Sequence, residues 1–518
     1  MLEKFAKAVE DTERHANQLT ENGAVGYRTA GSALVDFCFR VSSYRNKGKD
    51  EIVNDFSKMY HESPLLAVKM MFMAGDIRGG MGERRLFGAC LDWLAASHPE
   101  VAKAVIPLVP EYGRWDEVVE VSRNSNVHSF AVEMMRKQLT EDIVNARNGQ
   151  SISLLAKWLP SVNTSSRDKC AMGRRLAVEF GMTERQYRKT LSSLRSHLKV
   201  VETKMSSNNW SEIDYNAVPS KANAIYRGAF LKHDSERRQK YLEDLKEGKA
   251  KINAGAVFPY DIVHRYMGDK CGYHRMDLNV DNTLEAMWKA LPDYVGDKGA
   301  GTICMVDGSG SMDTTIGNTG VTCHDVARSL GIYFAERLDG SFKNKYISFG
   351  ARPTIVDFGD STLARKISIC TEHDDCSNTD IEKAFKLVLA AAVHDGLKQE
   401  EIPRNILVIS DMEFDAATTC NTFRNDFGAW QETLFESISR RYAEAGYQMP
   451  RLVFWNVCSR TCTVPIQENA HGVALVSGFS PYIASMVLSE KLDPREVVLE
   501  KLADKRYDAV EEAVKEIV

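Results

Sequence analysis

Residues 302–312 read TICMVDGSGSM, and this stretch decides the fold of the C-terminal part of the chain. Its first five residues form an apolar run as long as a buried strand, which ends at Asp307 and a glycine-rich turn. Similar runs lie at 345–349, 405–410, 451–457 and 472–476, and helix-like segments at 321–338, 381–393 and 427–445 separate them. Continuous apolar strands that alternate with helices predict a doubly wound, mostly parallel sheet covered on both faces.

The loop after the first of these strands carries oxygen ligands at alternate positions. Asp307, Ser309 and Ser311 are separated by glycines, which permit the tight backbone path that turns three side chains toward one cation. An oxygen-only site of this kind suits Mg²⁺ or another divalent cation. A turn in which Asp307 caps the next helix is the structural alternative. Two further strand-to-helix loops contribute Thr379 and Asp411, which favours the metal site because ligands of such sheets bind beyond the carboxyl ends of the strands.

The acidic cluster also raises the question of catalysis. Asp380 and Glu413 are the additional carboxylates that could serve as a base or hold a second metal. No GxSxG, HExxH, P-loop or GxGxxG motif accompanies them, so we expect a binding protein and no enzyme. A metal-dependent nuclease that uses the same carboxylates is the enzymatic alternative. His324 and His373 are expected to be surface or helix-cap residues.

The first part of the chain reads as one helix after another. Apolar residues recur at three- and four-residue steps in 64–73, 83–96, 101–109 and 128–139, the pattern of amphipathic helices. Short connections between them predict antiparallel pairs stacked as a HEAT-like α-solenoid. We therefore expect a helical repeat domain at residues 1–297, an α/β domain at 298–490 and a helical tail at 491–518.

The net charge of −5 conceals an uneven distribution. Residues 1–300 carry a net +5 and residues 301–518 a net −10, while residues 161–240 hold 16 basic and 8 acidic side chains. The average excludes a histone-like nucleic-acid binder, yet the basic stretch leaves a local surface for anions open. A merely solvated charged face is the other interpretation of that stretch.

Candidate RNA contacts come from this basic stretch and from the glycine-rich string DIRGGMGERR at 76–85. In that string, the backbone amides at a helix N-terminus could receive a phosphate, and a simple turn between two helices is equally open. The candidates, chosen on charge and placement, are Arg78, Arg84, Arg85, Arg174, Arg175, Arg188, Lys189, Arg195 and Lys199.

Cysteine usage and the N-terminal sequence bear on location. The eleven cysteines lie mostly in apolar contexts, with neither a secreted-type framework nor paired spacing for zinc. The first residues, MLEKFAKAVEDTERHAN, are charged and helical, unlike a signal peptide, and no apolar run is long enough to span a membrane. We expect a cytoplasmic protein without a membrane partner.

The order DGSGS (307–311), Thr379, Asp411 resembles the metal-ion-dependent adhesion site of the von Willebrand factor A domain, over about residues 298–490. The resemblance implies that Asp307, Ser309, Ser311 and Thr379 hold the ion, and that Asp411 acts through water. A helical repeat region before such a domain also resembles the TROVE-containing Ro proteins, which bind small non-coding RNAs and whose repeats form a ring. The strings RGGMGERRLF, YGRWDE, KWLPS, YRKTLSSLRSHLKVVE and VPSKA look closer to an uncharacterised Ro-like family of phages, bacteria and plants.

Two functions are compatible with this organisation. The first is a non-enzymatic protein that binds small non-coding or single-stranded RNA through the helical domain, while the Mg²⁺ site takes a carboxylate from a protein partner. The second is a metal-dependent protein-interaction scaffold that binds no RNA.

Overall fold

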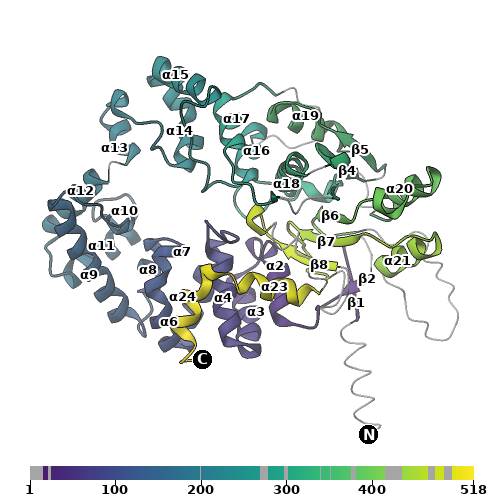
Figure 1. Cartoon of the computed structure of the whole chain (residues 1–518). Coiled ribbons are helices and arrows are strands. Elements are labelled where there is room, and N and C mark those ends of the chain that lie inside the picture. The colour runs from purple at the N-terminus through teal and green to yellow at the C-terminus, as the bar shows by residue number, and fades with distance from the viewer. Residues whose placement is uncertain are drawn as a thin grey trace, which may run out of the picture. The chain divides into compact units, whose positions relative to one another are not determined.

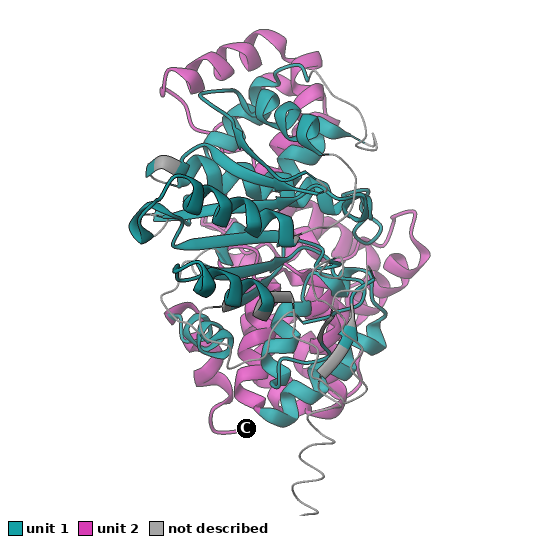
Figure 2. Cartoon of the chain, turned by 90° about the vertical axis from the view of Figure 1, so that its right-hand side faces the viewer, with its two compact units in different colours: residues 1–62, 257–504 teal, residues 63–256, 505–518 magenta. Residues whose placement is uncertain are grey.

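The computed structural model describes residues 16–21, 25–198, 200–268, 278–296, 301–338, 340–350, 352–374, 381–414, 434–464, 473–483 and 493–518. Two compact units divide the chain, as Figure 2 shows: unit 1 is formed by residues 1–62 and 257–504, and unit 2 by residues 63–256 and 505–518. Up to residue 300 the described chain is helical apart from a short hairpin, and an α/β region follows, which confirms the predicted combination of fold classes. The units do not follow the predicted boundaries at 297/298 and 490/491. The N-terminal residues 1–62 belong to the same unit as residues 257–504, and the C-terminal residues 505–518 belong to the same unit as residues 63–256.

Unit 1 contains a six-stranded sheet with the strand order β5-β4-β3-β6-β7-β8. All neighbouring strands are parallel except β5, which pairs antiparallel with β4 at the sheet edge. The mostly parallel sheet is therefore confirmed. The strands are β3 (Thr302–Asp307), β4 (Lys345–Phe349), β5 (Thr354–Asp357), β6 (Asn405–Ser410), β7 (Arg451–Asn456) and β8 (Val473–Ser477).

Helices cover both faces of this sheet (Figure 1). On one face, α18 (Cys323–Arg337) packs on β3, β4 and β6, and the ring of Phe334 meets that of Trp455 edge-on at 5.5 Å. On the other face, the alternate strand residues share a core with α2 (Ala33–Arg40), α20 (Ile381–His394) and α21 (Leu434–Glu444). Both faces of each central strand are buried, which explains their continuous apolar sequence.

The remaining elements of unit 1 come from both of its stretches of chain, residues 1–62 and 257–504. They are β1 (Ala16–Leu19), β2 (Val25–Tyr27), α3 (Lys49–Glu62), α16 (Pro259–Met267), α17 (Asn282–Lys289), α19 (Leu363–His373) and α23 (Pro494–Leu502). The hairpin β1–β2 continues into a bridge between Tyr27 and Val464, so the chain's first described strands are held by a contact remote in sequence.

A glycine sets the distance between α18 and the sheet. A Cβ atom placed on Gly331 would lie 2.7 Å from Cγ2 of Val306, the residue before Asp307 in β3. This approach is closer than two carbon atoms tolerate, so a larger side chain would push the helix or the strand outward.

Gly331→Ala is therefore expected to lower the free energy of unfolding by about 1–3 kcal/mol, as overpacked core positions do. The matched control is Gly88→Ala in helix α5 (Arg84–Ser97), where a Cβ would meet nothing within 4 Å and where alanine favours the helix. Urea denaturation followed by circular dichroism measures both variants. Equal stability changes in the two would show that Gly331 does not set the helix–sheet distance.

Unit 2 is helical throughout its described residues (Figure 1). Its helices are α4 (Pro64–Gly75), α5 (Arg84–Ser97), α6 (Pro99–Val105), α7 (Val109–Tyr112), α8 (Trp115–Val121), α9 (His128–Arg147), α10 (Leu155–Trp158), α11 (Arg167–Glu179), α12 (Glu184–His197), α13 (Val201–Ser206), α14 (Ser220–His233), α15 (Ser235–Lys246) and α24 (Asp508–Val514). Helices that follow each other in sequence mostly pack on each other, and α24 from the C-terminus packs on α4 and α6. Local signals begin these helices: Ser63 caps α4 ahead of Pro64, and Thr183 with Gln186 forms a capping box at α12.

Among the described residues, no helix has the length and apolar character needed to cross a membrane.

Candidate functional site

The carboxyl end of β3 places a buried carboxylate between two strands. Asp307 is the last residue of β3, and its side chain is fully buried. Its Oδ1 accepts a hydrogen bond from the N–H of Ser309 at 2.9 Å, and its Oδ2 accepts one from Ser410 Oγ of β6 at 2.6 Å. Ser309 Oγ and Ser311 Oγ lie 3.0 Å apart. The structure thus brings together the three oxygen-bearing residues of the DGSGS loop.

These residues lie where the strand order of the sheet reverses. From β3 the chain continues to β4 on one side, whereas β6, β7 and β8 follow on the other side. In open α/β sheets, ligands bind in the crevice outside the carboxyl ends of the strands at such a reversal. Asp307 ends β3 and Asp411 follows the end of β6, so the two carboxylates occupy the expected position.

Asp411 is the second buried carboxylate at this edge, with 1% of its surface exposed. Its Oδ1 accepts a hydrogen bond from the N–H of Glu413 at 3.2 Å, and its Oδ2 lies 3.4 Å from Arg460 Nη2. Burial, and then the negative charge of Asp307, raise the pKa of Asp411 to about 7. Burial also raises the pKa of Asp307, against the hydrogen bonds from Ser410 and Ser309. Two carboxylates that repel each other in a desolvated position would be stabilised by a cation.

A buried ion pair joins α18 to the end of α19 beside this site. Arg328 of α18 and Asp374 after α19 are 2% and 4% exposed, and Arg328 Nε donates to Asp374 Oδ2 at 2.7 Å. A Cβ on Gly308 would lie 3.1 Å from Asp374 Oδ1, so Asp374 approaches the DGSGS backbone closely. Thr379, another predicted ligand, lies outside the described residues.

The donor set of the site fits a hard cation that keeps several waters. Within the described part of the chain, no group of three or more His, Cys, Asp or Glu side chains could hold a metal ion. A cation beside Asp307 would therefore depend on the hydroxyls of Ser309 and Ser311 as well as on carboxylates. Oxygen ligands of this kind suit Mg²⁺, which binds few protein groups and retains water.

Glu413, one of the two carboxylates considered for catalysis, is occupied by hydrogen bonds. Its Oε1 accepts from Ser459 Oγ and from the N–H groups of Arg460 and Thr461 at 2.8–3.0 Å. Its Oε2 accepts from the N–H of Glu21 at 2.8 Å. Glu413 thus joins the loop after β7 to the N-terminal hairpin. Asp380, the other candidate, lies outside the described residues.

The two histidines near the site differ in environment. His373 is exposed at the end of α19, as expected. His324 is buried, which corrects the expectation of a surface or cap position: its Nδ1 lies 2.9 Å from Asp313 Oδ1, and its Nε2 is buried and has no hydrogen-bond partner among the described residues. The sequence carried no signal for this pairing, because it depends on how the turn at 310–313 folds back on α18.

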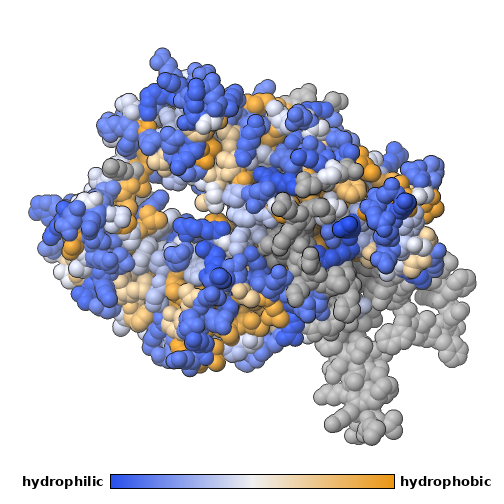
Figure 3. All heavy atoms as spheres, in the orientation of Figure 1, coloured by the Kyte–Doolittle hydropathy of each residue, from blue (hydrophilic) through white to orange (hydrophobic). Residues whose placement is uncertain are grey.

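The basic stretch at 161–240 runs from α11 into α15, and its described candidate residues lie in α11 and α12, where the surface is mostly hydrophilic (Figure 3). Arg174 and Arg175 are exposed but paired, with Glu184 at 3.3 Å and Glu179 at 3.0 Å respectively. Arg188 and Lys189 are exposed and form no ion pair within the described residues. Lys199 lies outside the described residues.

Arg195 points inward, onto the residues that precede α11. Its Nε donates to the carbonyl of Ala156 at 2.8 Å, its Nη2 to that of Leu159 at 2.7 Å, and its Nη1 to Ser161 Oγ at 2.8 Å. Burial lowers the pKa of Arg195. Arg195 therefore fixes the KWLPS segment, a role that charge counting did not reveal.

The glycine-rich string forms an internally bonded turn. The N–H groups of Arg78, Met81, Gly82 and Glu83 all donate to acceptors in residues 73–76. Asp76 binds Arg506 from the C-terminus, with Nη2 to Oδ1 at 2.8 Å. Since these amides are already used, the structure favours a turn between helices over a phosphate site.

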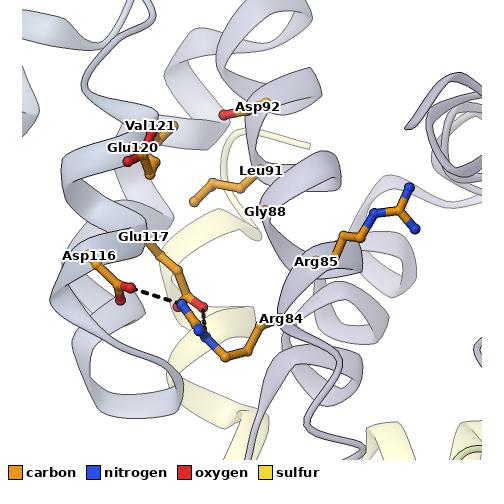
Figure 4. Close-up of a pocket in the computed structure, with 9 residues that line it drawn as sticks. All are labelled: Arg84, Arg85, Gly88, Leu91, Asp92, Asp116, Glu117, Glu120 and Val121. Atoms are coloured by element: carbon orange, nitrogen blue, oxygen red, sulfur yellow. Dashed lines mark hydrogen bonds and ion pairs between the residues drawn. The ribbon is translucent and has the colours of Figure 1, made fainter. Parts of the chain in front are cut away.

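The three arginines of this string are placed differently. Arg78 Nη1 donates to the carbonyl of Glu111 at 3.0 Å. Arg84 lies at a cavity of about 410 Å³ and pairs with Glu117 at 2.9 Å and Asp116 at 3.0 Å, whereas Arg85 points away from both carboxylates (Figure 4). The charge of Arg84 is balanced locally.

Comparison with known proteins places this organisation in a family. The domain of unknown function DUF7788 matches residues 301–517, which begin at β3. Uncharacterized protein L728 of Acanthamoeba polyphaga mimivirus is 28% identical over 521 residues, covering 93% of this chain and 86% of the relative. The domain of unknown function DUF2828 matches residues 20–111 and 118–300. Neither of these two family descriptions names Ro proteins or von Willebrand factor A domains. Because the DUF2828 match covers more than half of the sequence, the chain belongs to the DUF2828 family.

Proposed function

We propose that this protein binds single-stranded or small non-coding RNA through unit 2 without catalysing a reaction. The observation that carries the proposal is the exposed basic surface of α11 and α12. Residues 167–197 hold eight basic and three acidic side chains, and Arg188 and Lys189 are not neutralised within the described residues. Clustered cations bind nucleic acid by releasing the counterions of its phosphates.

The architecture supports the same function. A helical array before a sheet with a DGSGS loop resembles Ro proteins, whose helical repeats bind RNA and whose second domain is of the von Willebrand factor A type. On this view unit 2 is a HEAT-like solenoid. Arg188 and Lys189 are then the first contacts to test, while Arg174, Arg175 and Arg84 already have acidic partners.

In unit 1, the proposed ligand is Mg²⁺ or another divalent cation, held by Asp307, Ser309 and Ser311. Thr379 would be a further direct ligand and Asp411 would act through water, as in the adhesion site that the loop resembles. The bound cation would supply a positive centre for a carboxylate of a protein partner. Asp307 and Asp411 are both buried; Asp307 accepts a hydrogen bond from Ser410, and Asp411 lies 3.4 Å from Arg460.

A metal-dependent interaction scaffold without RNA binding is the second candidate. The buried carboxylates of Asp307 and Asp411, at the point where the strand order reverses, favour this second candidate. A cation held there would bind a partner's carboxylate without any contribution from the basic surface of unit 2. The two candidates differ in whether the cations of α12 matter for function.

Binding of a labelled single-stranded oligoribonucleotide to the full-length protein tests the proposal. Filter binding between about 50 and 200 mM salt is expected to show affinity that falls steeply, by roughly 0.7 logarithmic units per contacted phosphate and per tenfold rise in salt. Arg188→Ala with Lys189→Ala should reduce that slope by about 1.4 if each side chain contacts one phosphate. Lys398→Ala with Arg440→Ala, which removes two exposed cations of unit 1, is the matched control. If the protein shows no affinity for RNA at the lowest salt concentration, the proposal is contradicted. The metal-dependent interaction scaffold then becomes the better candidate.

A further inference from the structure

A cavity of about 570 Å³ opens beside α12 in unit 2, and its lining is basic and rich in hydroxyls. No carboxylate of the described residues lines it. Its polar lining includes Ser161, Tyr187, Arg188, Lys189, Ser192, Arg195 and Thr203. Its volume is within the range of sites for small organic ligands.

One wall of the cavity is a fixed guanidinium group. Arg195 is half-buried, and its three hydrogen bonds to Ala156, Leu159 and Ser161 hold it in one position. All three acceptors are uncharged, and no carboxylate pairs with Arg195 among the described residues. A half-buried cation without a counter-charge is unfavourable, and an anion in the cavity would compensate it.

The other polar groups of the lining can complete an anion site. Arg188 and Lys189 contribute two exposed positive charges at the cavity, and the hydroxyls of Ser161, Ser192 and Thr203 can donate hydrogen bonds. A planar guanidinium together with a lysine and hydroxyl donors is a set of groups that binds phosphate oxygens well.

The second cavity of unit 2 provides a contrast within the same helical array. It is lined by Asp92, Asp116, Glu117 and Glu120 as well as Arg84 and Arg85, so acidic groups outnumber basic ones there (Figure 4). Its arginine Arg84 is paired with two of those carboxylates. The α12 cavity differs from it in that no carboxylate of the described residues lines it.

We infer that the α12 cavity binds a phosphate monoester carried by a nucleoside-sized group, with Arg195, Arg188 and Lys189 around the phosphate. A monoester dianion suits a cavity lined by three cations better than the single charge of an internal phosphodiester does. The ligand is either a free mononucleotide or the terminal phosphate of an RNA. If the ligand is an RNA end, the inference rests on the proposed function. If the ligand is a free mononucleotide, the inference is independent of the proposed function.

Isothermal titration of the full-length protein with uridine 5′-monophosphate and with uridine tests the phosphate requirement. The monophosphate is expected to bind at least about tenfold more tightly, since uridine lacks the phosphate oxygens that accept charge-assisted hydrogen bonds from the cavity lining. Arg188→Ala with Lys189→Ala should weaken monophosphate binding about tenfold or more. Arg185→Ala with Lys169→Ala is the matched control, because it removes two exposed cations of α11 and α12 outside the cavity lining and should leave binding within about twofold.

A second arm compares a 5′-phosphorylated with a 5′-hydroxyl oligoribonucleotide and so separates the two sources of phosphate. Preference for the phosphorylated end, with competition by the monophosphate, identifies the RNA end as ligand. Monophosphate binding without RNA binding would support the cavity and contradict the proposed function. RNA binding that ignores the terminal phosphate, with equal or no affinity for the monophosphate and uridine, would overturn the inference and leave RNA binding by the surface intact.

Discussion

Arg328→Ala is expected to lower the free energy of unfolding of unit 1 by about 3–5 kcal/mol, because it leaves the carboxylate of Asp374 buried without its counter-charge. Both side chains are almost completely inaccessible, and Arg328 Nε and Nη2 lie 2.7 and 2.6 Å from Asp374 Oδ2. The pair connects α18 to the end of α19 next to Gly308. The loss should also disturb the DGSGS loop.

Two control proteins separate this effect from a general loss of charge. Arg440→Ala removes an exposed arginine of α21 that pairs with Glu444 at 2.9 Å, and should cost at most about 0.5 kcal/mol. Arg328→Met with Asp374→Leu replaces both charges by apolar groups and should recover much of the stability. Urea denaturation followed by tryptophan fluorescence measures all three. If Arg328→Ala is at least as stable as Arg328→Met with Asp374→Leu, the destabilisation does not come from the uncompensated charge of Asp374.

Asp411→Asn is expected to change how the stability of unit 1 depends on pH. Burial holds the pKa of Asp411 at about 7, above the ordinary value of 3.8, so folding disfavours the ionised carboxylate. The wild-type protein should therefore lose stability as the pH rises from about 4 to 7, and the loss should be complete above about pH 7. At 1.4 kcal/mol per pKa unit, the penalty without a divalent cation reaches on the order of 4 kcal/mol. Asparagine carries no such penalty, so the variant should be more stable at pH 8 and similar at pH 4.

Magnesium should act on the same carboxylate in the opposite direction. Because a divalent cation stabilises the ionised site and binds only the folded state, it should raise the melting temperature of the wild-type protein at pH 8. The shift should be lost in Asp411→Asn and kept in Asp360→Asn, which changes an exposed carboxylate of the same unit. Thermal melts at pH 4, 6 and 8, with chelator and with Mg²⁺, measure both effects. The role assigned to Asp411 would be contradicted if Asp411→Asn and the wild-type protein had the same pH profile of stability. It would also be contradicted if Mg²⁺ raised the melting temperatures of Asp411→Asn and Asp360→Asn equally.

The regular elements of the sheet could be predicted from local pattern. The runs at 345–349 and 405–410 are observed as strands with those limits, since a strand buried on both faces is apolar at every position. The edge strand β5 escaped prediction because three of its four residues are exposed and Ile355 faces solvent. The hairpin β1–β2 escaped because its strands are only four and three residues long, too short for a clear local pattern.

The division into units could not be predicted, for a related reason. The apolar face of a helix shows that it packs on something, but not on which core. Val35 and Phe39 of α2 join the core of the sheet, although their pattern is that of any amphipathic helix. Likewise, Arg506 binds Asp76 across more than four hundred residues. For the candidate sites, spacing predicted the meeting of Asp307, Ser309 and Ser311, whereas the inward position of Arg195 depends on carbonyls supplied by another segment.

Ultraviolet crosslinking of a labelled single-stranded RNA to the full-length protein, with the crosslinked peptides identified by mass spectrometry, tests the central claim most directly. The claim is that unit 2 binds RNA through the surface of α11 and α12. Crosslinks are expected within residues 161–203, which contain Tyr187 of the α12 cavity, and they should decrease in Arg188→Ala with Lys189→Ala. Crosslinks confined to unit 1, or none at low salt, would contradict the claim.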